Sequence, residues 1–77
     1  AMTPLPWTAA TGDQDARYRH WMAGPVAASV YWSGYRWCVT VTPLPRSRKR
    51  RRYRDDFARE EEAMGYADSV LAGWCRG

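Results

Sequence analysis

The sequence predicts a small two-layer α+β domain in which one long helix packs on an antiparallel sheet of two or three strands. Two patterns support this prediction. Residues 26–42 alternate between apolar and polar positions around a Ser-Gly turn, and residues 55–74 repeat apolar side chains at helical spacing. A chain of 77 residues forms one domain with a small core. We therefore expect a single domain over 1–77, completed by an extended N-terminal arm.

The N-terminal arm is predicted to cover residues 1–12. Pro4 and Pro6 exclude a helix interior there and favour extended backbone. Trp7 is the large apolar residue of the arm. We expect its indole to pack on the core.

Two interpretations fit the segment that follows the arm. The first, which we adopt, is a short helix over 11–22, because its first residues have the spacing of a capping box. The second is a strand over 16–22, because tyrosine and tryptophan also suit strands. The helix would place three side chains on one face: Tyr18, Trp21 and Met22.

Residues 26–42 predict a β-hairpin. The runs VAASVYW and YRWCVTVT flank Ser33 and Gly34, and a two-residue loop with glycine is a hairpin signal. Such a loop would place eight apolar residues on one face, in the pairs Trp32–Tyr35, Val30–Trp37, Ala28–Val39 and Val26–Val41. The other face would meet water, with Tyr31 directly opposite Arg36. It would hold Ala27, Ser29, Tyr31, Arg36, Cys38, Thr40 and Thr42.

A Pro- and Arg-rich segment follows over 43–54. Its prolines end the second strand, because proline cannot donate to a sheet. Residues 46–54 read RSRKRRRYR, and seven of these nine residues carry a positive charge. The sequence leaves two states open for this run: a loop throughout, or a third strand over 50–54. A third strand would support a hairpin that is marginal by itself in water.

Residues 55–74 are predicted to form an amphipathic helix that covers the apolar face of the hairpin. Asp55 or Asp56 would cap it, and the glutamates at 60–62 lie where the helix dipole favours negative charge. Gly65 would permit a close approach to the sheet, and Gly73 could end the helix. The apolar arc holds Phe57, Ala63, Met64, Ala67, Val70, Leu71 and Trp74. We also expect most aromatic residues in the core: Trp32, Trp37, Trp74, Tyr35 and Phe57.

Charge is unevenly distributed along the chain. The run 46–54 holds +7 in a chain of net charge +4, so the remaining residues sum to −3. Like charges at this density destabilise a fold, which favours a role in binding an anionic partner, and arginine binds phosphate through paired hydrogen bonds. We predict a binding surface made of Arg46, Arg48, Lys49, Arg50, Arg51, Arg52, Tyr53 and Arg54, extended by Arg36 and Tyr31.

The sequence argues against an enzyme and against a metal cofactor. Cys38 and Cys75 match no ligand spacing, and a single histidine, His20, cannot complete a zinc site with them. Consecutive glutamates at 60–62 point in different directions on a helix, so they do not converge on a catalytic site. No apolar run approaches the roughly 18 residues of a membrane span. We expect no cofactor, no small-molecule substrate, no membrane, and a monomer or homodimer.

The amino-acid composition indicates the kind of genome that encodes the chain. The chain has eleven Arg, one Lys, no Ile and no Asn, which indicates a GC-rich coding sequence of a bacterium or its phage. We therefore expect the protein in the cytoplasm of a bacterial host cell.

The run RRRYRDDFAREEEAMGYADSVLAGW after a hairpin resembles part of a known domain family. Residues 26–74 are similar to the arm-type DNA-binding domains of tyrosine recombinases, in which three strands precede a helix that begins soon after a Phe. In that family the sheet enters the major groove and basic strand residues contact the backbone. The chain departs from the pattern in residues 1–25 and in the lack of a catalytic domain after the helix. The resemblance implies four contact residues: Arg36, Arg50, Arg52 and Arg54.

In size and setting the chain also resembles small phage accessory proteins such as anti-CRISPR inhibitors, which bind a bacterial nucleoprotein effector. The expected function is therefore non-enzymatic binding by a phage or mobile-element protein. Its Arg-rich patch would dock on a bacterial nucleoprotein complex and inhibit nucleic-acid recognition. The alternative is a stand-alone DNA- or RNA-binding module that contacts phosphates through the same segment.

Overall fold

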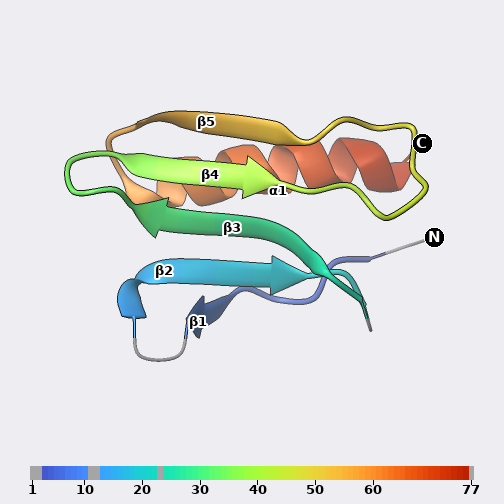
Figure 1. Cartoon of the computed structure of the whole chain (residues 1–77), viewed down its shortest axis with the longest axis horizontal. Helices are drawn as coiled ribbons and strands as arrows, with labels where there is room; N and C mark the ends of the chain where they lie inside the picture. The colour runs from blue at the N-terminus through green and yellow to red at the C-terminus, as the bar shows by residue number, and fades with distance from the viewer. Residues whose placement is uncertain (1–2, 11–12, 23, 77) are drawn as a thin grey trace.

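The computed structural model describes residues 3–10, 13–22 and 24–76, and in them it places an antiparallel sheet and one helix. The strands follow chain order in the sheet, and each pairs antiparallel with the next. Figure 1 shows the helix behind the sheet, so one face of the sheet is covered and the other faces the viewer. The elements are β1 (Thr8–Ala10), β2 (Asp13–His20), β3 (Val26–Trp32), β4 (Trp37–Val41), β5 (Arg52–Phe57) and α1 (Glu60–Arg76).

The predicted class, an antiparallel sheet with one C-terminal helix, is confirmed, but the predicted two or three strands are five in the structure. The short helix over 11–22 was wrong, because Asp13–His20 forms β2 and pairs with β3; residues 11 and 12 lie outside the described part. The arm is extended as predicted, and it also pairs with the sheet through β1 and a bridge from Pro4 to Trp21. Tertiary pairing thus overrode a weak local helix signal.

The β3–β4 hairpin has the predicted faces but a different register. Its loop has four residues, Ser33 to Arg36, closed by a 2.9 Å hydrogen bond from the Ser33 N–H to the Arg36 carbonyl. The pairing therefore shifts by two residues, and a shift of two leaves every side chain on the same face. Tyr31 consequently lies opposite Cys38, and the predicted Tyr31–Arg36 pair was wrong. The observed pairs include Trp32–Trp37, Val30–Val39 and Ala28–Val41.

β5 decides between the two states left open for the Arg-rich run. Residues Arg52–Phe57 pair with β4, and Phe57 lies opposite Trp37. The helix therefore begins at Glu60 and not at 55, and neither Asp55 nor Asp56 caps it. Pairing with β4 joins Arg52, Tyr53, Arg54 and Phe57 to the sheet, with a register shift at Asp55 and Asp56, and places Phe57 against the core.

α1 has the predicted acidic first turn and the predicted apolar arc except for Phe57, which lies in β5. It continues through Gly73 to Arg76, so Gly73 does not end it. Gly65 was also misread, because a Cβ there would meet nothing within 4 Å. This glycine therefore lies on the solvent side and permits no close approach.

The core lies between α1 and the covered face of the sheet. Trp7 packs against it from the arm, as predicted. Two aromatic predictions were wrong: Tyr35 is 78% exposed in the hairpin loop, and Trp32 is 38% exposed. Cys38, predicted to meet water, is buried. Ala27, also predicted to meet water, is fully buried although it has the parity of the open face. The buried cluster comprises Trp21, Ala27, Ala28, Val30, Val39, Val41, Ala63, Ala67 and Leu71.

Candidate functional site

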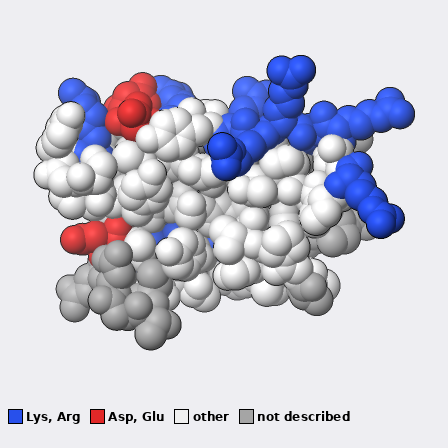
Figure 2. Space-filling view, in the orientation of Figure 1, with Lys and Arg blue, Asp and Glu red and all other residues white. Residues whose placement is uncertain are grey.

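The Arg-rich run divides into an exposed loop and the start of an edge strand. Residues 46–51 form the second part of the connection from β4 to β5, all of them are exposed, and Arg52 begins the strand. We call residues 46–52 the basic loop. Figure 2 shows its long cationic side chains projecting from the end of the molecule where β4 connects to β5. Within the described part of the chain, none of these cations forms an ion pair; the ion pairs that occur there involve Arg17, Arg19 and Arg54.

The first half of the basic loop forms local turns next to Leu44. The Ser47 N–H donates to the Leu44 carbonyl at 3.1 Å, and the Lys49 N–H donates to Ser47 Oγ at 3.1 Å. Arg46 takes a φ of 68°, in the left-handed region that tight turns use. Leu44 is half-buried against the core. The loop is therefore held at both ends, by Leu44 and by β5.

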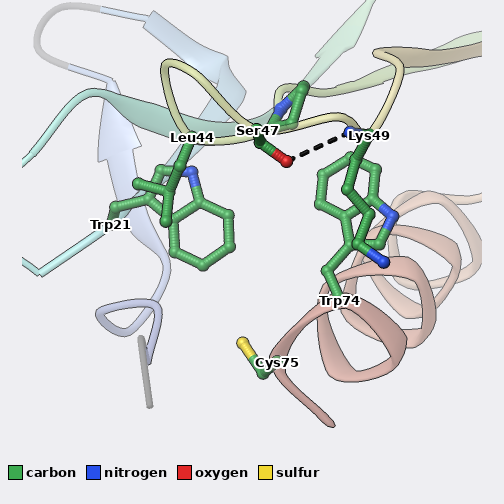
Figure 3. Close-up of a pocket in the computed structure, with 7 residues that line it drawn as sticks. Trp21, Leu44, Ser47, Lys49, Trp74 and Cys75 are labelled. Atoms are coloured by element: carbon green, nitrogen blue, oxygen red, sulfur yellow. Dashed lines mark hydrogen bonds between the residues drawn. The ribbon is translucent and has the colours of Figure 1, made fainter. Parts of the chain in front are cut away.

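A cavity of ≈ 130 Å³ lies under this loop (Figure 3). Trp21 and Leu44 line one side, Trp74 and Lys49 line the other, and Cys75 lies between the two sides. The Trp21 indole N–H donates to the Thr42 carbonyl at 3.2 Å, which fixes the Trp21 side of the cavity. The basic loop thus rests on ordered aromatic side chains of the core.

Arg54 differs from the other cations of the run because it is bound within the protein. Its Nε and Nη2 donate to the two carboxylate oxygens of Asp56 at 3.0 and 2.7 Å. Its guanidinium carbon lies 4.6 Å from the Phe57 ring centre and 5.1 Å from that of Tyr66. Hydrogen bonding to Arg54 lowers the pKa of Asp56, and the same contact raises the pKa of Arg54. This ion pair competes with any phosphate contact by Arg54.

The sheet face that α1 leaves open carries tyrosines. Strand pairing places Tyr18, Ser29, Thr40 and Tyr53 in one row across β2, β3, β4 and β5. Tyr31 lies on the same face of β3, two residues from Ser29. Tyr18, Tyr31 and Tyr53 are 39%, 38% and 54% exposed. These five residues form what we call the tyrosine face: three aromatic rings with two small hydroxyl side chains between them.

Tyr53 and Tyr31 interact across this face. A side-chain hydrogen bond with Tyr31, with smaller contributions from desolvation and from Cys38, raises the pKa of Tyr53 to about 12. A surface hollow extends from these two tyrosines to the hairpin loop. It is lined by Tyr31, Ser33, Tyr35, Arg36, Cys38, Tyr53, Asp55 and Asp56. The hollow brings Arg36 near Tyr31, although the two residues are not paired across the strands.

The sequence interpretation missed Tyr18, because it placed this residue on a helix. The missed signal is the alternation along β2. Arg17 and Arg19 point to the α1 side, where Arg17 pairs with Glu60 at 3.4 Å and Arg19 pairs with Asp68. Tyr18 between them must then point to the open face. Charged residues at the covered positions hid the period of two.

The described residues hold no cluster of three or more His, Cys, Asp and Glu that could bind a metal ion. α1, the helix of the described part, is too short and too polar to cross a membrane. Cys38 and Cys75 are free thiols. Comparison with protein-family models, with curated proteins and with solved structures gives no match for this chain. Its function must therefore be argued from the site itself.

Proposed function

We propose that the protein is a non-enzymatic nucleic-acid-binding module that contacts phosphates through the basic loop and acts in the bacterial cytoplasm. The observation that supports this proposal is the position of the loop. Its cations project without acidic partners, and they lie at one end of an uncovered sheet face that carries exposed tyrosines. Guanidinium groups bind phosphate oxygens, and aromatic rings stack on bases, so both parts of a nucleic acid have a partner.

The basic loop suits a phosphate backbone better than a single anion. Its cations spread along an exposed segment and do not converge on one pocket. Six phosphate contacts would give a salt dependence with a log–log slope of about −4 for a single strand, because each neutralised phosphate releases counterions. We expect binding that weakens steeply as salt rises.

A second candidate is docking on a bacterial nucleoprotein complex, with anti-CRISPR-like inhibition of nucleic-acid recognition by a phage protein. The mixed charge of the surface hollow favours it, because Arg36 lies there beside Asp55 and Asp56. A protein or nucleoprotein surface can match charges of both signs, which a bare phosphate backbone does not. The basic loop would then contact an acidic surface or a nucleic-acid channel of the complex.

The test compares charge reversals at two places. Arg51→Glu in the basic loop should weaken binding of labelled DNA or RNA in fluorescence anisotropy, and the triple change Arg50→Glu, Arg51→Glu, Arg52→Glu should abolish it. Arg59→Glu is the matched control, because Arg59 is also exposed but precedes α1 at the other end of the molecule. We expect Arg59→Glu to bind nearly as the unmodified protein does. Circular dichroism should give the same fold for all four proteins.

Two results would contradict the module. One is a lack of binding to either nucleic acid at about 100 mM salt, where contacts to several phosphates remain strong. The other is an equal loss of nucleic-acid affinity in Arg51→Glu and Arg59→Glu. That result would show that affinity depends only on the net charge of the protein and not on the basic loop. If the protein binds neither nucleic acid, docking on a nucleoprotein complex predicts a different result. A purified CRISPR effector complex should then bind the protein but not its triple variant.

A further inference from the structure

The tyrosine face has no role in the phosphate contacts proposed above. α1 covers the other side of β3, β4 and β5, and the described chain places no element over this side (Figure 1). Tyr18, Tyr31 and Tyr53 therefore keep exposed rings on the open face of the sheet. Large apolar surface that stays exposed next to a charged patch indicates an interaction site.

The tyrosine face is continuous with the basic loop. Tyr53 follows Arg52 in β5, so the end of the loop and the first ring of the face are adjacent residues. Tyr18 lies at the far end of the same row, three strands away, which is about 14 Å at the usual strand spacing. Ser29 and Thr40, between the rings, are small. A ligand with alternating charged groups and planar rings can thus lie along the path from the basic loop across the sheet.

The width of the sheet argues against a duplex as the occupant. Five paired strands span about 19 Å, whereas the major groove of B-DNA is about 12 Å wide. The whole face is therefore too broad to enter the groove. A duplex also keeps its bases stacked on each other, so only their edges are available, while a single strand offers the faces of its bases.

We infer that the tyrosine face binds the bases of single-stranded nucleic acid, with Tyr31 and Tyr53 as stacking platforms and the basic loop holding the adjoining phosphates. This inference rests on the proposed function and names its substrate class. Tyr18 extends the platform at the far end of the row. Sheet surfaces with exposed aromatic side chains stack two or three bases in this way.

The experiment measures anisotropy of a labelled single-stranded oligonucleotide of about twelve nucleotides and of its duplex, over a range of salt. We expect the single strand to bind at least about tenfold more tightly than the duplex. Tyr31→Ala and Tyr53→Ala should each weaken single-strand binding about 5- to 150-fold, which is the usual range for loss of one stacked base. The salt slope should stay unchanged, because neither tyrosine contacts phosphate in this arrangement.

Two control variants separate stacking from other causes. Tyr31→Phe and Tyr53→Phe keep the ring and remove the hydroxyl, so each should bind the single strand nearly as the unmodified protein does. Arg51→Gln should differ from the alanine variants in two ways: it should weaken binding of the duplex as well as the single strand, and it should reduce the single-strand salt slope by about 0.7. Thermal melting of each variant checks that the fold is intact.

The inference fails if the duplex binds as tightly as the single strand, or if both alanine variants bind the single strand normally. If Arg51→Gln still weakens binding in that case, the basic loop retains its proposed role and only the tyrosine face loses its own. If the protein binds neither form, the inference and the proposed function fail together.

Discussion

The two faces of the sheet differ in what their side chains contact. On the covered face Val30, Val39 and Val41 are fully buried beneath α1, while on the open face Tyr31 and Tyr53 keep exposed rings. Both sets come from the same strands, since alternate residues of a strand point to opposite sides. The difference teaches that, for these valines and tyrosines, stability and binding are separated by residue parity, while the small open-face residues Ala27 and Cys38 are also buried. Substitutions on one face should change folding, and substitutions on the other should change binding.

The largest expected effect is the loss of core packing against the covered face. Leu71 of α1 is 1% exposed and belongs to the buried cluster. Leu71→Ala should lower the free energy of unfolding by about 2–5 kcal/mol, because it removes buried methyl groups and leaves a cavity. Chemical denaturation measures this change. Tyr18→Ala on the open face is the control. If it lowers the free energy of unfolding as much as Leu71→Ala does, the separation of the two faces is contradicted.

An intermediate effect is expected where polar groups join the covered face to the helix. Asp68 accepts hydrogen bonds from the Trp7 indole at 3.1 Å and from Arg19, whose Nε is buried without a partner among the described residues. Asp68→Ala should lower the free energy of unfolding by about 1–2 kcal/mol, because it leaves these donors unsatisfied. Ser69→Ala, an exposed neighbour, should change it by less than about 0.5 kcal/mol. Equal melting temperatures for the two variants would show that Asp68 adds nothing.

The smallest effect on folding is expected on the open face, where a pKa is the sharper measure. Tyr31→Phe removes the hydroxyl that raises the pKa of Tyr53 to about 12, so this pKa should fall toward the ordinary 10.0. The contact favours the neutral phenol, so its contribution to stability is present below pH 10.0 and is lost as pH rises through about 12. Nuclear magnetic resonance of the tyrosine rings follows the titration. If the titration midpoint of Tyr53 is unchanged in the Tyr31→Phe variant, the Tyr31 hydroxyl does not raise the pKa of Tyr53.

Periodicity predicted the helix and the hairpin faces well, because both depend on apolar side chains that must be buried. It gave the wrong hairpin register, because a shift of two residues preserves the faces and leaves no trace in the pattern. The strand at β2 was ranked below a helix for a different reason. Its positions on the covered side are filled by Arg17 and Arg19, whose pairing with acids of α1 could not be known before the fold.

The binding surface was predictable in its charge but not in its shape. The density of positive residues marked the basic loop directly, while its connection to the core through Leu44 depends on tertiary packing. Tyr53 was predicted as part of the binding surface within the Arg-rich run, and Tyr31 as an extension of that surface. Their place on one face with Tyr18 required the order of all five strands. Arg54 resembled its neighbours in sequence, and only its geometry separates it, through the ion pair with Asp56.

The order of the strands has a consequence for folding kinetics. Each strand pairs with the next one along the chain, so the sheet can form from short loops with a small entropic cost of closure. The contacts of α1 with the first strands are less local: Asp68 joins Trp7 and Arg19, 61 and 49 positions away, and Glu60 joins Arg17. We expect the hairpins to form early and the arm to dock on α1 last. Unfolding should then begin with release of the arm, before the strands separate.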